Sequence, residues 1–117
     1  MKTSKMPNYL DGFLTIYRPD MSNKSHFGAK KNITSIEGME IIYKLAFAQS
    51  YKRLEDMEFA ESNGRSLALK VKVRLVNGIK NSDKVVIGNT LYDIMYLDED
   101  RYKRELYLYL EEVRSLE

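Results

Sequence analysis

The stretch from residue 83 to residue 110 limits the possible folds of this chain more strongly than any other part of the sequence. It consists of short runs of β-branched, aromatic and aliphatic residues separated by turn residues. The runs cover residues 85–87, 91–97 and 104–110, and the interruptions are Gly88-Asn89 and Asp98-Glu99-Asp100. Runs divided in this way are typical of consecutive antiparallel hairpins. We therefore predict an antiparallel sheet here and expect no active site in it.

Four other segments predict further regular structure. Residues 13–18 form an apolar run, and residues 39–47 place apolar side chains at every second position, as strands do. The clearest strand pattern is residues 67–76, where leucine and valine alternate with a set that includes two lysines and an arginine. Residues 51–62 have the spacing of one or two helical turns, which Asn63-Gly64 closes. The chain is therefore predicted to be mainly β, with one short α-helix.

The end of the chain fits two periodicities. Between residues 102 and 117, leucine, valine and tyrosine recur at helical spacing, and no glycine or proline interrupts them. Over residues 106–110, leucines also alternate with tyrosines, which is the spacing of a strand. Because tyrosine is enriched in strands, the strand is favoured, although periodicity alone leaves both structures open.

Length and composition indicate a single domain over residues 1–117. A chain of this length buries roughly 65% of its unfolded surface without covalent staples. It has no cysteine, which excludes disulfides, thiolate zinc sites and cysteine nucleophiles and fits an intracellular protein. The first ten residues lack the apolar core of a signal peptide, and no apolar run approaches the roughly 20 residues of a membrane span. The formal net charge of +2 is too mild to name a nucleic-acid partner.

Residues 20–38 differ in composition from the rest of the chain. Ser, Asn, Lys and Gly dominate this segment, and its apolar residues stand singly. Loops longer than about 12 to 15 residues in a compact domain are usually functional or disordered, so the segment is either a functional loop or a flexible surface excursion. It contains His26, the only histidine, which rules out a histidine-based metal cluster or dyad.

Acidic residues are the remaining candidates for chemistry. Asp98, Glu99 and Asp100 have oxygen ligands for a divalent cation but lack the spacing of a calcium loop, so a solvated turn is expected. Residues 55, 58 and 61 are glutamates that share a helical face beside basic residues, as in an exposed salt-bridged surface. No phosphate loop, nucleophile elbow or zinc motif is present. We therefore predict no catalytic residue, no metal site, no cofactor and no enzymatic activity.

Basic residues alternate along one predicted strand. Lys70, Lys72 and Arg74 would form a stripe on one strand face and, with nearby tyrosines, a platform for nucleic-acid binding. The tyrosines are Tyr92, Tyr96, Tyr107 and Tyr109. The alternative is that the stripe is only the solvated face of the strand and that the tyrosines pack against the sheet. Tyrosine is also enriched at protein–protein interfaces.

Four pieces of sequence follow one another between residues 10 and 113. They are a strand ending in Arg18-Pro19 with a polar loop after it, a strand that runs into a short acidic helix, an alternating basic strand, and a terminal unit of apolar runs around an acidic turn. They cover residues 14–19, 43–56, 69–74 and 79–113. In this order and spacing, the chain resembles the head–tail joining or head-closure (stopper) proteins of long-tailed bacteriophages.

The resemblance implies a small antiparallel β-barrel or sandwich with one long loop and one short α-helix, and a strand at the C-terminal end. It also implies a structural protein of the virion neck, made in the cytoplasm of the bacterial host. Copies would form a ring, of twelve subunits by resemblance, beneath the portal and its adaptor. That ring would close the DNA exit channel after packaging and present a surface to the tail-completion protein. Double-stranded DNA would pass without sequence-specific binding, and no membrane would be involved.

By the same resemblance, the loop over residues 20–38 faces the channel and becomes ordered on assembly. The residues expected to act there are Asp20, Lys24, His26, Phe27, Lys30 and Lys31. A polar segment of this kind is able to acquire its order only when neighbours supply contacts. Two alternatives remain open: a tail-completion or tail-terminator ring protein and, from a different class, a nucleic-acid-binding small β-barrel.

Overall fold

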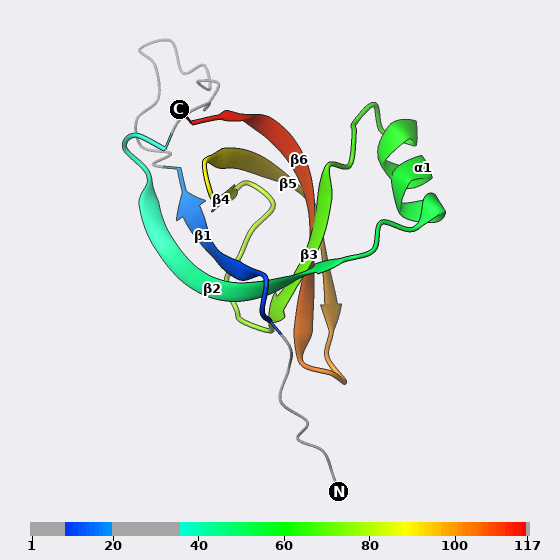
Figure 1. Ribbon diagram of the computed structural model, residues 1–117, viewed down its shortest axis with the longest axis horizontal. Helices are drawn as coiled ribbons and strands as arrows, with labels where there is room; N and C mark the ends of the chain where they lie inside the picture. The colour runs from blue at the N-terminus through cyan, green and yellow to red at the C-terminus, as the bar shows by residue number, and fades with distance from the viewer. Residues whose placement is uncertain (1–8, 20–35, 117) are drawn as a thin grey trace, which may run out of the picture.

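The computed structural model describes residues 9–19 and 36–116, which contain six strands and one helix. The strands are β1 (Gly12–Arg18), β2 (Glu40–Ser50), β3 (Leu69–Arg74), β4 (Lys84–Ile87), β5 (Thr90–Asp100) and β6 (Glu105–Ser115), and the helix is α1 (Leu54–Ser62). All neighbouring strands are antiparallel and close into a barrel in the order β1-β2-β3-β6-β5-β4 (Figure 1). The prediction of a mainly β fold with a small antiparallel barrel and one short helix is confirmed.

Closure of the barrel depends on the pairing of β1 with β4, which are distant in sequence. Thr15, Ile16 and Tyr17 pair with Val86, Val85 and Lys84 across this seam. Every strand has two neighbours in the closed order, but two of the seams are short: three residue pairs join β2 to β3 and three join β1 to β4.

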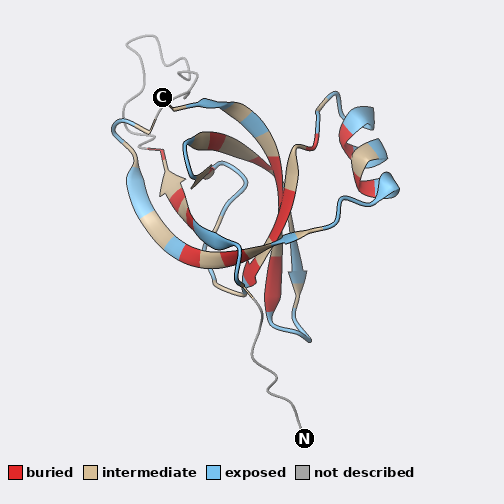
Figure 2. Ribbon diagram, viewed as in Figure 1, coloured by how far each residue is buried: buried red, intermediate tan, exposed pale blue. Residues whose placement is uncertain are grey.

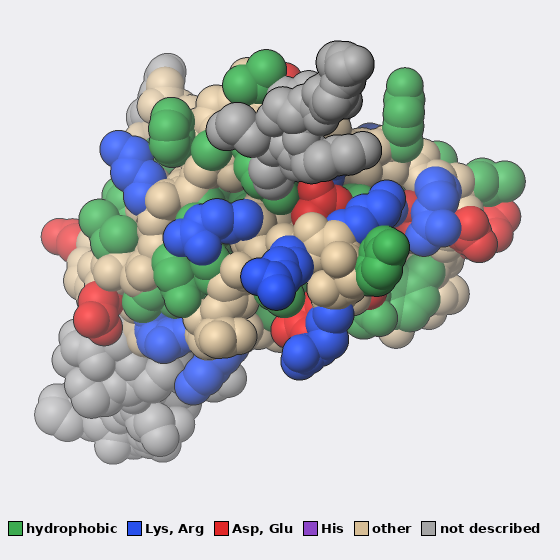
Figure 3. Space-filling view, turned by 90° about the horizontal axis from the view of Figure 1, so that it is seen from below, with side chains coloured by type: hydrophobic (Ala, Val, Ile, Leu, Met, Phe, Trp, Pro, Cys, Tyr) green, Lys and Arg blue, Asp and Glu red, His purple; other side chains and the backbone are tan. Residues whose placement is uncertain are grey.

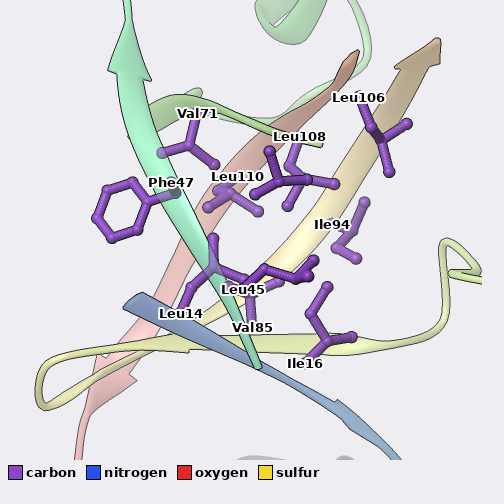
Figure 4. Packing of buried hydrophobic residues seen from close by; sticks show 11 residues of the cluster. Leu14, Ile16, Leu45, Phe47, Val71, Val85, Ile94, Leu106, Leu108 and Leu110 are labelled. Carbon is purple, nitrogen blue, oxygen red and sulfur yellow. The ribbon is translucent and has the colours of Figure 1, made fainter. Parts of the chain in front are cut away.

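The barrel interior is filled by aliphatic side chains and the ring of Phe47, which alternate along the strands with outward-facing residues (Figure 4). Leu14 and Ile16 of β1, Val71 and Val73 of β3, and Leu108 of β6 are all completely buried. Alternation of buried and exposed residues is visible along the strands in Figure 2. The same alternation decides the C-terminal segment. It forms strand β6, as predicted, because leucines at every second position enter the interior.

Of the two turns predicted around β5, one is confirmed and the other is wrong. Gly88 and Asn89 connect β4 to β5 as predicted, and Gly88 has a φ of 59°, the positive value that the first residue of a type II′ turn requires. The predicted turn at residues 98–100 is wrong. Strand β5 continues to Asp100, and the turn covers residues 101–104. The acidic residues remain in the ladder because each has a partner on β6, including Asp100 opposite Glu105.

Helix α1 lies outside the barrel in the connection between β2 and β3 (Figure 1). Its Ala60 is buried against Leu67 and Tyr109, so the helix covers the outer surface of β6. The helix ends at Ser62, before Asn63-Gly64 as predicted, and the φ of Gly64 is 71°. Within the described part of the chain, no helix is long and apolar enough to span a membrane.

Candidate functional site

The N-terminal turn of α1 and the outer faces of β3 and β6 bring charged and aromatic side chains together. Asp56 of α1 and Lys70 of β3 are both nearly buried, each with 6% of its surface exposed. Arg53, immediately before the helix, and Tyr107 and Tyr109 of β6 complete the group. We call these five residues the Asp56 cluster.

Asp56 is the centre of this cluster. Its carboxylate accepts hydrogen bonds from Lys70 Nζ at 3.0 Å and from Arg53 Nη2 and Nε at 3.0 and 3.2 Å. The backbone N–H of Arg53 also donates to it at 3.0 Å, which caps the first turn of the helix. Lys70 Nζ lies 4.9 Å from the ring centroid of Tyr109 and 5.4 Å from that of Tyr107, within cation–π range. The cluster therefore fastens α1 to the barrel wall.

These contacts change the proton affinities of both buried groups. Burial alone would raise the pKa of Asp56, but the hydrogen bonds from Arg53 and Lys70 outweigh it and lower the pKa from 3.8 to about 2. Burial would lower the pKa of Lys70, but its hydrogen bond to Asp56 prevails and raises it. Both groups are therefore charged at neutral pH.

Beside the cluster is a concavity of about 370 Å³. It is lined by Ser50, Tyr51, Arg53, Lys70, Asp98, Tyr107 and Tyr109. The positive charges of Lys70 and Arg53 in this lining are neutralised by carboxylates. Both side chains form ion pairs with Asp56, and Arg53 also lies 3.3 Å from Glu55. The concavity therefore offers tyrosine rings and hydroxyls but no surplus of positive charge for a phosphate backbone.

The stability supplied by Asp56 is expected to depend on pH. The folded-state pKa of about 2 lies below the ordinary 3.8, so the stabilisation is complete above roughly pH 5 and is lost as the pH falls through 2. At pH 7, Asp56→Asn should lower the free energy of unfolding by about 2 kcal/mol. Near pH 2 this difference should be small, and it should vanish at lower pH. Urea unfolding of both proteins at several pH values measures it.

Glu58→Gln provides the matched control for that experiment. Glu58 lies on the same helix but its side chain is exposed, so the substitution should change stability by no more than about 0.5 kcal/mol at any pH. A constant destabilisation of Asp56→Asn between pH 7 and pH 2 would contradict the role assigned to the carboxylate.

The three residues of the predicted basic face have separate environments. Lys70 was expected on a solvated face, and this is wrong because α1 covers it and Asp56 binds it. Lys72 is half-buried, with Nζ 3.5 Å from Glu105, and only Arg74 is exposed. The face therefore does not present three free cations. The alternation did place all three residues on the outer side of β3, as predicted.

The tyrosines of the predicted platform do not form one exposed surface. Tyr109 is buried beneath α1 and makes an edge contact with Tyr96 at a centroid distance of 5.3 Å. Tyr96 in turn contacts Phe59 of the helix at 5.8 Å. A buried ring has no face free for a base, so Tyr109 is a packing residue.

The predicted loop residues Asp20, Lys24, His26, Phe27, Lys30 and Lys31 lie outside the residues that the structure describes. The start of the loop is described. Arg18, at the end of β1, makes a two-point contact with the completely buried Asp83: Nε to Oδ1 and Nη2 to Oδ2, both at 2.9 Å. Asp83 also accepts the backbone N–H of Lys80 at 2.8 Å, and Arg18 Nη2 donates to the carbonyl of Gly78 at 2.6 Å. The root of the loop is thus tied to the β3–β4 connection.

Two key acidic residues were not singled out by sequence reasoning. Asp83 stands at the start of the predicted sheet, and Asp56 lies in the predicted helix whose glutamates were expected to form an exposed surface. The available signal for Asp56 was its position three residues after Arg53, the place where an acidic side chain reaches back to cap a helix. Among the described residues, no group of three or more His, Asp or Glu side chains is arranged to bind a metal ion.

The sequence matches no protein-family model, and comparison with curated proteins finds no match. Fold and site together define the structural class of this protein. It is a closed six-stranded β-barrel with a helix that is docked on the barrel wall through a buried ion pair.

Proposed function

We propose that this protein is a structural connector of the neck of a tailed-phage virion. Copies form a ring beneath the portal and adaptor, close the DNA exit channel after packaging, and offer a docking surface to the tail. The loop over residues 20–38 acts in that channel. The protein performs no reaction in this role.

Support comes first from the correspondence between sequence pieces and structural elements. The strand ending in Arg18-Pro19 is β1, and the strand that leads into an acidic helix is β2 followed by α1. The alternating basic strand is β3, and the terminal unit supplies β4, β5 and β6. The four sequence pieces on which the resemblance rests therefore contain all six strands of the closed barrel.

The observation that carries the proposal is the anchoring of the loop. The residues on either side of it, Arg18 on β1 and Glu40 on β2, are paired in the sheet, so the loop begins and ends at one end of the barrel. The contact of Arg18 with the buried Asp83 holds that end in place. A long polar segment on such a fixed base is able to extend from a rigid ring without disturbing the barrel.

Replacing residues 21–34 with a Gly-Ser linker tests the role of the loop. Changes in loop length cost little, so circular dichroism and the unfolding midpoint should stay close to those of the unaltered protein. Particles assembled with the variant should package DNA and then lose it, measured as the fraction of DNA protected from nuclease. A linker variant that yields stable, infectious particles would count against the gating role.

Particles that lack the protein separate the alternatives. A head-closure role predicts filled heads that lose DNA and carry no tails. A tail-terminator role predicts sealed heads and tails of abnormal length. Absence of the protein from purified virions, measured by mass spectrometry, would exclude both.

A further inference from the structure

Two outer faces of the barrel carry exposed apolar side chains beside charges that have no partner among the described residues. The first, which we call the β1–β2 face, consists of Phe13, Ile41 and Lys44. Phe13 and Ile41 are 65% and 59% exposed. The register places all three on the outer side of the two strands, since Phe13 pairs with Ala46, Lys44 with Thr15 and Ile41 with Tyr17.

The second, which we call the α1 face, consists of Leu54, Glu58, Phe59 and Glu61 of the helix with Tyr96 of β5. Leu54 and Phe59 are 69% and 51% exposed, and Tyr96 contacts Phe59. Helix α1 contains four carboxylates and no basic residue. Negative charge in its last turn opposes the helix dipole, so Glu61 does not serve the stability of the isolated helix.

The two faces lie on opposite sides of the molecule. In the barrel order β1-β2-β3-β6-β5-β4, β1 stands across from β6 and β2 across from β5. Helix α1 packs on the β5–β6 side, and Figure 1 shows it on the right, away from β1 and β2. Seen from below, basic side chains spread over the surface, and acidic ones lie at both ends and near the middle of this view (Figure 3).

We propose that the α1 face of one copy docks on the β1–β2 face of the next copy. Each face carries exposed apolar side chains beside its charged ones, and the acidic Glu58 and Glu61 of one complement the basic Lys44 of the other. Exposed apolar side chains with polar neighbours mark protein interaction sites, and opposite charges fix the register of a contact. The inference rests on the proposed ring-forming function and identifies the surfaces through which the ring forms.

The arrangement of the faces determines the kind of assembly. A contact between two different surfaces is heterologous and adds copies head to tail, whereas a two-fold contact would stop at a dimer. Placement on opposite sides of the barrel allows each copy to have two neighbours at once.

Site-specific cross-linking tests the contact, and the absence of native cysteine removes any background. The variant Ala46→Cys/Ser62→Cys keeps Lys44, Glu58 and Glu61, because Ala46 lies opposite Phe13 on β2 and Ser62 ends α1. It is treated with a short bis-maleimide at about 1 mM protein, where even a contact with a millimolar Kd is substantially formed. The two cysteines of one molecule lie on opposite sides of the barrel, so the reagent joins different copies. A denaturing gel should show a ladder of two, three and more copies. Each single variant alone should stay monomeric, and a mixture of the two should stop at dimers.

Two further variants serve as controls. The pair Asn81→Cys/Glu112→Cys occupies exposed positions outside both faces and should give no ladder. Adding Phe13→Ser to the Ala46→Cys/Ser62→Cys variant should reduce the ladder at least about tenfold by weakening the contact. The unfolding midpoint should not change, because Phe13 is exposed.

Three results would overturn the docking arrangement: absence of a ladder, equal ladders from both cysteine pairs, or dimers formed by either single variant alone. The proposed function is tested separately by the DNA retained in particles. Leaking particles without a ladder would refute these two faces and leave the connector role standing. A ladder from a protein that is absent from virions would support these two faces and refute the connector role.

Discussion

Replacing Asp83 with alanine is expected to lower the free energy of unfolding by about 2–4 kcal/mol, because it removes a completely buried carboxylate that accepts three hydrogen bonds, while Arg18 is one-third exposed. Asp83 is completely buried and accepts two hydrogen bonds from Arg18 and one from the backbone of Lys80. Its loss frees the β3–β4 connection from the end of β1, and the adjacent β1–β4 seam closes the barrel. Urea denaturation followed by far-UV circular dichroism measures the change.

A double-mutant cycle shows whether the effect belongs to the pair. Arg18→Met should also destabilise, because it leaves the Asp83 carboxylate buried without its main partner. The double variant Arg18→Met/Asp83→Leu replaces both charges with apolar groups and should recover much of the loss, since a buried pair is often no better than its apolar equivalent. Strictly additive losses would mean that the two side chains stabilise the fold independently.

Most of the sheet was predictable from local alternation, because a strand that forms a barrel wall must send every second side chain inward. This holds for β3 and for the alternating leucines of β6. The β1–β4 seam had no such signal, since a pairing between segments about 70 residues apart leaves no local periodicity. The barrel itself was expected from the family resemblance and not from the spacing of residues.

The candidate site was harder to predict for the same reason. Alternation placed Lys70 correctly on the outer side of β3, but it does not show that a helix from another part of the chain covers that side. The burial of Lys70 and the charge that neutralises it come from Asp56, fourteen residues earlier. Acidic side chains were predicted to be exposed, because they are rarely buried without a partner. This prediction is wrong for Asp56 and Asp83, whose ion pairs allow them to be buried.

The largest effect on the fold is expected from Val73→Asp. Val73 of β3 is completely buried among the aliphatic side chains of the barrel interior. A carboxylate there would have no partner, and the cost of burying an unpaired charge is comparable to the whole stability of a small domain, about 5–15 kcal/mol. The variant should be unfolded at neutral pH, with loss of the β-type circular dichroism spectrum and of a cooperative urea transition.

Arg74→Asp is the matched control, since it introduces the same side chain one residue later on the same strand. Because successive strand residues face opposite sides, this aspartate points to solvent, and the change should stay within about 1 kcal/mol. Val73→Ala distinguishes the effect of the buried charge from the effect of losing the valine side chain. It leaves a cavity and should give a folded protein that is less stable by about 1–3 kcal/mol. If Val73→Asp unfolded cooperatively with a midpoint close to that of Arg74→Asp, water would have to reach the barrel interior, and the packed core would not be what stabilises the fold.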